Sequence, residues 1–280
     1  MILPTRAIHW YPGHMEKTFR QMKEALKRVD FVIEVCDARV ARSSRNPELL
    51  ALTEHKDRML LLNKADLADP DVTAAWIDKN KEDGVLTVGT NLHNRSDIAN
   101  IRRLILEANK ARIERAKARG YVSRPLRLMI AGIPNSGKST LINRLAGKSS
   151  LKTQNKPGVT RQLVWLRAGK DLELLDTPGV LWPKLDTEAE KCALAASGAI
   201  PDDLLPKEEV AACLLNLLLA DYEQILREKY GMQGDVTLHE LAVSQHLILS
   251  GGEPDLFRTA TRFINDFRQG SIGRLSLERP

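Results

Sequence analysis

Apolar and polar positions follow different patterns in the two parts of the chain. The first part contains short apolar runs at residues 30–37, 58–62, 85–88 and 126–131. Segments with helix start signals or helical spacing of apolar residues lie between or after them, at residues 48–53, 70–80, 97–119 and 139–146. Because short buried runs that alternate with helices are typical of parallel sheets, we predict an α/β fold with a parallel-rich sheet flanked by helices.

Two local signals support individual elements of this fold. Asn46 followed by Pro47 predicts a helix start, since asparagine caps helix N-termini and proline suits the first helical position. Residues 162–167 and 171–175 predict a hairpin that turns at Gly169.

The pattern changes after Pro183. Apolar residues recur at helical spacing in residues 210–222, 238–249 and 256–267. Gly and Pro separate these stretches and no strand pattern is present, so we predict a small all-α C-terminal domain. The expected domains are residues 1–204 and residues 205–280.

Composition limits the classes of protein that fit. The 280 residues suit one α/β domain with a smaller companion, and the 43% hydrophobic and 28% charged residues are typical of a soluble protein. No apolar run approaches the ~20 residues of a membrane span, so we expect no membrane partner. The first residues lack a signal or transit pattern, so we expect a cytoplasmic location. Cys36, Cys192 and Cys213 are far apart and predict neither a zinc site nor a disulfide.

The formal net charge of +6 favours polyanionic partners such as nucleic acid. Residues 110–127 contain seven basic side chains against one acidic side chain. Such a run is equally typical of a solvated helix face, so both interpretations stay open.

The most specific motif is G-x-x-x-x-G-K-[ST] at residues 132–139, which follows a predicted strand and precedes a predicted helix. A chance glycine-rich turn is the less favoured interpretation. Backbone N–H groups surround the phosphate oxygens, the catalytic Lys138 neutralises the β and γ phosphates, and the Ser139 hydroxyl ligates Mg²⁺. The expected nucleotide contacts of this loop are Asn135, Ser136, Gly137, Lys138, Ser139 and Thr140.

Two further segments predict the rest of the phosphate and metal site. Asp176 follows a predicted strand and suits the holding of Mg²⁺ through water, while the Gly179 N–H suits contact with the γ-phosphate. Thr160 lies between these two phosphate elements in the chain. It can complete the Mg²⁺ shell and take part in hydrolysis when the γ-phosphate orders its loop.

Residues 63–66 read Asn-Lys-Ala-Asp directly after the second apolar run. The Asp66 carboxylate can accept from both N1–H and the exocyclic amino group of guanine, a paired contact that adenine cannot offer. We expect Asn63 at the other base edge and the Lys64 stem beneath the ring. Together with the phosphate loop, this element predicts binding of GTP and GDP.

The guanine element precedes the phosphate loop, whereas in ordinary small GTPases it follows. With this order the chain resembles the circularly permuted YlqF/RbgA-type ribosome-assembly GTPases over essentially its whole length. The resemblance rests on both motifs and on residues 10–15, 37–39 with 44–47, 157–160, 176–179 with 181–183, and 273–275. Tyr11 stands where the family commonly has Phe, and residues 89–91, expected to back the base, match the family poorly.

The resemblance implies a P-loop GTPase that hydrolyses GTP to GDP and phosphate and binds the large (50S) ribosomal subunit and its rRNA during late assembly. It implies a hydrophobic residue, here Val180, where many GTPases have a water-positioning Gln, with slow turnover stimulated by a large partner. It associates Asn135 with a K⁺ ion that adds positive charge near the phosphates. The expected rRNA contacts are Arg258, Arg262, Arg268, Arg274 and residues 39–45.

His14 is the candidate for the catalytic group that positions water, because Val180 cannot do so. An imidazole can accept or donate near neutral pH, and Pro12 and Gly13 predict a loop at this point. A role in packing or in RNA contact has equal weight.

Two other functions stay open. One is a nucleotide-gated switch that binds a protein and does not act on the ribosome. The other is an ATP-dependent enzyme, which Asp66 disfavours. We expect a monomer without a DNA partner. Because residues 176–180 lead into the helical domain, the nucleotide state can bias that domain.

Overall fold

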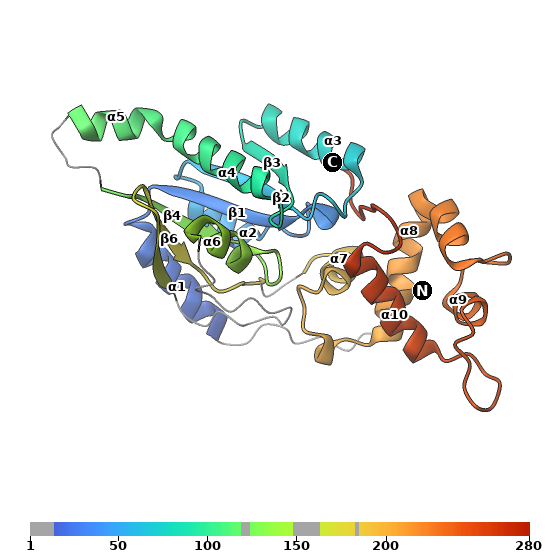
Figure 1. Ribbon diagram of the computed structural model, residues 1–280. Coiled ribbons are helices and arrows are strands. Elements are labelled where there is room, and N and C mark those ends of the chain that lie inside the picture. Colours follow the sequence, from blue (N-terminus) through green and yellow to red (C-terminus); the bar gives the residue numbers. More distant parts are fainter. Residues whose placement is uncertain (1–13, 119–123, 148–162, 183–184) are drawn as a thin grey trace.

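The structure, a computed structural model, describes residues 14–118, 124–147, 163–182 and 185–280 (Figure 1). Its centre is a six-stranded sheet of order β3-β2-β1-β4-β6-β5. The strands are β1 (Phe31–Asp37), β2 (Arg58–Asn63), β3 (Leu86–Thr90), β4 (Leu126–Ala131), β5 (Val164–Ala168) and β6 (Leu172–Asp176). β5 is antiparallel to β6 and the other neighbours are parallel, so the predicted parallel-rich sheet and its hairpin are confirmed.

Helices cover both faces of the sheet. Alternate residues of a strand point to opposite sides, and the central strands have apolar residues on both sides that must be buried. Ile33 and Val35 of β1 pack on the side of α4 (Arg95–Ala108) and α6 (Lys138–Ala146). Val32 and Cys36 face the side that α1 (His14–Leu26), α2 (Pro47–Thr53) and α3 (Pro70–Glu82) cover. The central strands are therefore buried on both faces, as their continuous apolar runs predict.

Capping side chains set several helix limits. Asn46 accepts from the backbone N–H groups of Glu48 and Leu49, and Pro47 begins α2, so this predicted helix start is confirmed. The helix predicted over residues 97–119 is two helices. Asn109 ends α4 and its side chain bonds to Ile105 O, after which α5 (Lys110–Ala118) begins. Figure 1 shows α5 extending beyond the sheet.

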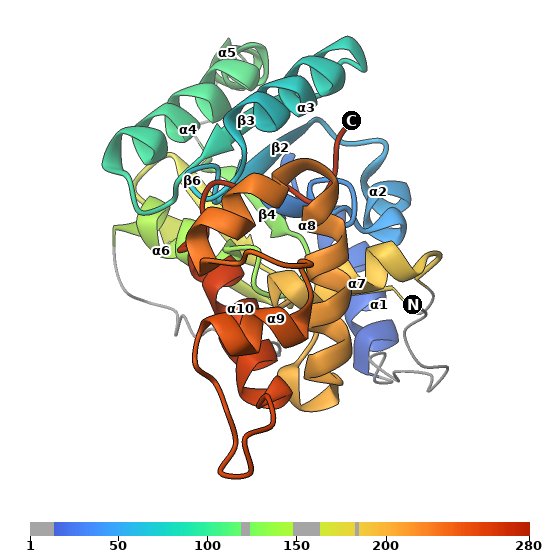
Figure 2. The same ribbon diagram turned by 90° about the vertical axis from the view of Figure 1, so that its right-hand side faces the viewer.

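The last part of the described chain is helical, as predicted. It contains α7 (Glu188–Ser197), α8 (Lys207–Tyr230), α9 (Leu238–Ser244) and α10 (Leu256–Gln269), which share one apolar cluster and are called the helical layer below (Figure 2). α7 belongs to this layer although it precedes residue 205, where the sequence places the domain boundary. α9 ends earlier than predicted, and Ile248 instead pairs with Pro254 in an isolated bridge. None of the described helices is long and apolar enough to cross a membrane.

The C-terminal tail, residues 271–280, returns from the helical layer to the α/β part, and the C-terminus lies beside α3 (Figure 1). The tail backbone donates from Leu275 N to Leu67 O at 3.0 Å. Glu278 O in turn accepts from the Trp76 indole N–H of α3 at 3.1 Å. The loop after β2 is thus held by a segment at the far end of the chain.

Candidate nucleotide site

Polar residues meet at the carboxyl ends of the central strands. Asp37 of β1 pairs in register with Asn63 of β2, and Ile130 of β4 pairs with Asp176 of β6. In open parallel sheets this edge is where ligands bind. The sheet order therefore brings the predicted guanine element and both phosphate elements to one edge.

The loop between β4 and α6 has the backbone that its motif predicts. Asn135 and Gly137 have positive φ angles of 58° and 110°, which curl the chain ahead of the helix. A Cβ atom on Gly137 would lie 2.3 Å from Asn63 Nδ2, so this position accepts only glycine next to the guanine element. The curled loop turns the N-terminus of α6 toward the sheet edge, the geometry that binds phosphate in other proteins.

The Lys138 side chain is buried within this loop and donates from Nζ to Ile133 O at 2.7 Å. Burial lowers the pKa of Lys138 to about 8, and the neighbouring Asp176 carboxylate partly opposes that shift. Ser136 Oγ donates to the same carbonyl at 3.0 Å. The ammonium is therefore held at the centre of the loop, where a phosphate group would meet it.

The segment after β6 lies against the phosphate loop. Asp176 is buried at the end of the strand, and Thr177 Oγ1 donates to Ile130 O of β4 at 2.7 Å. A Cβ atom on Gly179 would lie 2.7 Å from Pro134 Cα and 2.9 Å from Lys138 Nζ. Gly179 thus places its backbone beside the ammonium, where the sequence expects a contact with the γ-phosphate.

The guanine element is tied to its surroundings by side-chain bonds. Asn63 Nδ2 donates to Ser136 O at 2.7 Å, and Asn63 Oδ1 accepts from Leu92 N at 3.4 Å. The Asn63 amide therefore joins the guanine element to the phosphate loop, and its expected contact with the base edge stays a prediction. Lys64 has a positive φ of 61° and its Nζ donates to Asp37 Oδ2 at 2.7 Å, while Asp66 is exposed.

The remaining predicted site residues divide between described and undescribed segments. Ser139 and Thr140 lie half-buried in the first turn of α6. Asn135 donates from Nδ2 to Gly198 O at the end of α7, at 2.7 Å. His14 begins α1, where the sequence predicted a loop, and its side chain is outside the description. Thr160 also lies outside the described residues, as do residues 10–13 and 157–159.

The sequence patterns indicate no role for Asp37 in the nucleotide site, and they place Arg39 only among the expected rRNA contacts. Both side chains are buried at the end of β1, with side-chain exposures of 3% and 1%, and they form a two-bond ion pair. The available signal was a pair of opposite charges directly after a buried apolar run, since such charges are rarely buried without partners.

The structure separates the arginines that were expected to contact RNA. Arg39 is buried, and Arg268 donates to Ala195 O and Ala196 O of α7. Arg274 is exposed, but it donates to Ala65 O and Ala68 O in the loop after β2. These three guanidinium groups hold segments together. Burial corrects the expected rRNA contact of Arg39, while those of Arg268 and Arg274 stay predictions. Arg258 and Arg262 are exposed on α10.

The fold and the site define a GTPase whose guanine element precedes its phosphate loop in the chain. The protein family described as "50S ribosome-binding GTPase" matches residues 127–233. "Ribosome biogenesis GTPase A" of Bacillus licheniformis is 41% identical, with 98% of each chain covered. The protein of the same name from Thermotoga maritima is 30% identical, with 97% of this chain and 94% of that protein covered. The chain belongs to the ribosome biogenesis GTPase A family.

Solved structures agree with this assignment. The GNP-bound YlqF from T. maritima superposes with a TM-score of 0.65 at 26% identity, over 94% of this chain and 98% of that one. The GDP-bound form gives a TM-score of 0.66 over 93% and 99%. The protein therefore binds guanine nucleotide and is a GTP-hydrolysing enzyme.

Proposed function

We propose that this GTPase acts in late assembly of the large ribosomal subunit, binds the 50S particle through rRNA, and hydrolyses GTP faster when bound to it. The observation that carries the proposal is the convergence of the guanine element and both phosphate elements at one sheet edge, in a chain whose relatives are named ribosome biogenesis GTPase A along nearly its full length. The family description names 50S binding, which supports the finer part of the proposal.

The roles of the site residues follow from their positions. Lys138 and the backbone of Asn135, Ser136, Gly137, Ser139 and Thr140 would hold the β and γ phosphates, and Gly179 would contact the γ-phosphate. Lys64 would lie under the guanine ring and Asp66 would bond to its edge. The exposure of Asp66 and the burial of the Lys138 ammonium support this division between base and phosphates.

Ser139 and Asp176 fit a Mg²⁺ ion, because both offer the oxygen donors that Mg²⁺ prefers and Asp176 acts electrostatically on the neighbouring Lys138. Bound Mg²⁺ neutralises charge on the phosphate oxygens. Thr160 would be a further ligand. Asn135 would bind K⁺ through its amide oxygen, since its nitrogen donates to Gly198 O.

The described part of the site supplies no glutamine for the attacking water. Val180 occupies the position after Gly179, its side chain is buried, and its carbonyl accepts from Asn46 Nδ2 at 3.0 Å. We therefore assign the positioning of water to His14, at the start of α1. The low intrinsic rate that this arrangement predicts would rise when the 50S particle binds.

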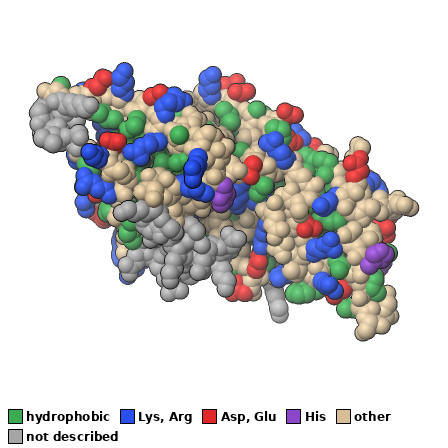
Figure 3. Space-filling model, in the orientation of Figure 1, with side chains coloured by type: hydrophobic (Ala, Val, Ile, Leu, Met, Phe, Trp, Pro, Cys, Tyr) green, Lys and Arg blue, Asp and Glu red, His purple; other side chains and the backbone are tan. Residues whose placement is uncertain are grey.

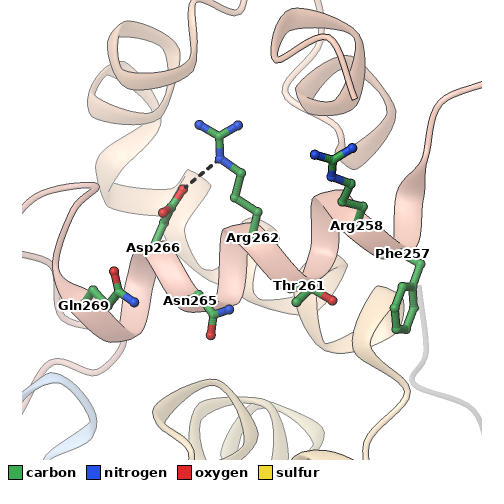
Figure 4. A pocket seen from close by; sticks show the side chains of 7 residues that line it. All are labelled: Phe257, Arg258, Thr261, Arg262, Asn265, Asp266 and Gln269. Carbon is green, nitrogen blue, oxygen red and sulfur yellow. Dashed lines mark ion pairs between the residues drawn. The ribbon is translucent and has the colours of Figure 1, made fainter. Parts of the chain in front are cut away.

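The exposed face of α10 is the surface that we assign to rRNA. Phe257, Arg258, Thr261, Arg262, Asn265, Asp266 and Gln269 line a surface pocket there (Figure 4). Figure 4 shows Arg258 and Arg262 extending from the same side of the helix, with Phe257 at its start. Guanidinium groups bind phosphates and an exposed aromatic ring stacks on unpaired bases, so this pocket suits single-stranded or looped RNA.

The test is binding to 50S particles at several salt concentrations. Changing both Arg258 and Arg262 to Glu should weaken binding and reduce the slope of log Kd against log salt by about 1–2, because each phosphate contact contributes about 0.7–0.9 to that slope. Lys and Arg are spread over both parts of the visible face, interspersed with acids (Figure 3), so a general charge effect needs a control. Arg103→Glu in α4, far along the chain at an exposed ion pair, is that control.

An unchanged slope and affinity in the double variant would contradict the rRNA surface. Binding that depends weakly on salt would favour the alternative, a nucleotide-gated switch whose partner is a protein. The cytoplasmic location, the monomeric state and the lack of a DNA partner stay predictions.

A further inference from the structure

Three charged side chains meet behind the guanine element. Asp37 accepts from the Arg39 guanidinium twice, from Nε at 2.9 Å and from Nη2 at 2.8 Å. The second carboxylate oxygen also accepts from Lys64 Nζ at 2.7 Å. Burial alone would raise the pKa of Asp37, but the charges of Arg39 and Lys64 outweigh burial and hold it well below its usual range. Asp37 is therefore an anion shared by two cations.

The Arg39 guanidinium also reaches the helical layer. Its Nη1 donates to Phe267 O at 2.8 Å and to Arg268 O at 3.2 Å, in the last turn of α10. It lies 4.8 Å from the centre of the Phe267 ring. A cation at a helix C-terminus interacts favourably with the carbonyl groups that have no partner within the helix. The carbonyl groups at the end of α10 thus fix the position of the Arg39 guanidinium, and the guanidinium in turn fixes the Asp37 carboxylate.

Stability alone does not account for this arrangement, because apolar side chains of similar volume often stabilise a core as well as a buried ion pair does. The Asp37 carboxylate also orients the side chains that donate hydrogen bonds to it, which an apolar side chain cannot do. Lys64 follows β2 in a left-handed backbone conformation and its side chain is 24% exposed. The bond from its ammonium to Asp37 fixes the far end of this long, flexible side chain. The aliphatic stem of Lys64, between its backbone and the ammonium, is therefore held at the sheet edge.

We propose that Asp37 is a positioning residue for guanine nucleotide binding, which holds Lys64 in the orientation that supports the base, and that Arg39 anchors Asp37 to the C-terminal end of α10. This inference rests on the proposed role of Lys64 beneath the guanine ring. It assigns a nucleotide-binding purpose to two buried side chains that act through Lys64.

The test is a double-mutant cycle on GDP affinity with Asp37→Asn and Lys64→Met. Each single variant should raise the Kd for GDP by about tenfold, and the double variant should raise it by about tenfold also, because the carboxylate acts through the ammonium. Asp37→Asn should weaken GDP and IDP equally, since these differ only in the amino group assigned to Asp66. A pair that merely supports the fold would give losses that multiply in the double variant.

The matched control is Asp30→Asn, at the opposite end of the same strand. Asp30 has 9% side-chain exposure, accepts from Arg124 at 2.8 Å and also accepts from the Arg127 backbone N–H. It therefore carries a similar buried charge far from the guanine element. Asp30→Asn should lower the midpoint of urea unfolding while leaving the Kd for GDP unchanged.

The outcomes separate this inference from the assignment on which it rests. If Lys64→Met leaves the Kd unchanged, both are overturned. If Lys64→Met weakens binding but Asp37→Asn does not, or if the two losses multiply, only the positioning role is overturned. Should Asp37→Asn fail to fold, Arg39→Lys replaces it in the cycle. A lysine keeps the charge but cannot reproduce the two bonds to Asp37 together with the Nη1 bond to Phe267 O, so a loss of about threefold that disappears in the Lys64→Met background is expected.

Discussion

The Lys138 ammonium sits inside the phosphate loop with a pKa that burial lowers to about 8, against the partial opposition of Asp176. Above this pH the free protein loses the proton, while the phosphates of a bound nucleotide favour the charged form. Binding must then take up a proton. We predict that the Kd for GDP is flat from pH 6.5 to 7.5 and rises above pH 8 toward about tenfold per pH unit.

Fluorescent GDP titrations between pH 6.5 and 9 measure this slope. Lys138→Arg is the control, because a guanidinium stays protonated throughout this range. The variant can bind more weakly, but its Kd should not acquire the same slope. A Kd for the unaltered protein that stays constant through pH 9 would show that Lys138 keeps its proton and that burial does not govern it.

Glu34 of β1 is a second buried charge, with 5% side-chain exposure and Arg45 Nε 3.8 Å away. Burial raises its pKa to about 7, and Arg45 and Arg58 partly oppose this shift. Between pH 4.5 and 7 the native state then binds more protons than the unfolded state, so the free energy of unfolding that Glu34 contributes falls as pH rises. Above pH 7 Glu34 is ionised in both the native and the unfolded state, so its destabilising effect on the free energy of unfolding no longer changes with pH.

We therefore predict that Glu34→Gln raises the free energy of unfolding by about 1–3 kcal/mol at pH 8 and by much less at pH 5. Urea unfolding at both pH values checks this result. Glu173→Gln is a useful comparison, because that carboxylate is 30% exposed and paired with Arg127 at 2.7 Å. Equal effects of Glu34→Gln at the two pH values would contradict the raised pKa.

At the scale of elements, the sequence predicted the helix and strand boundaries that neighbouring residues determine. The central strands were found because they are buried on both faces, and α2 because Asn46 caps it and Pro47 starts it. The break at Asn109 was missed because apolar spacing continues across it, although its side chain ends α4. α7 was missed because its small apolar residues show no clear helical periodicity. In the structure these residues are buried in one cluster with α8 and α10.

The C-terminal tail is an element without regular structure that the packing nevertheless requires. Leu275 is 1% exposed within the cluster of the helical layer, and its backbone bonds to Leu67 O. We predict that Leu275→Ala lowers the free energy of unfolding by about 2–4 kcal/mol, as expected for a buried leucine. Arg279→Ala, which removes only an exposed ion pair with Asp221, should lower it by less than about 1 kcal/mol. Denaturant unfolding with equal losses in both variants would mean that the tail is not part of the core.

At the scale of the whole molecule, sequence motifs identified the chemistry of the site but not the contacts that assemble it. The phosphate loop and the guanine element were each visible from spacing, and the structure brings them together at one edge. The bond from Asn63 to Ser136 joins motifs 73 positions apart, and the bond from Arg39 to Phe267 spans 228 positions. No local pattern encodes such pairs, so the roles of Arg39, Arg268 and Arg274 as internal connections required the fold.

The permuted order places the phosphate elements in direct contact with the helical layer. The segment after Gly179 enters the helical layer directly, since Leu181 and Trp182 pack in its apolar cluster. Asn135 of the phosphate loop also bonds to the end of α7. A change at the phosphates therefore has short physical routes to the surface that we assign to rRNA.

The measurement that tests the central claim most directly is GTP turnover by the purified protein in K⁺ buffer, alone and with purified 50S subunits. We predict slow turnover alone and a kcat raised about tenfold or more by 50S, since a partner that completes a GTPase site acts mainly on kcat. His14→Ala should abolish most of the stimulation while leaving the Kd for GDP unchanged, and Na⁺ in place of K⁺ should lower the stimulated rate. Turnover that is the same with and without 50S would contradict the proposed function, and would direct the search toward a protein partner of the nucleotide switch.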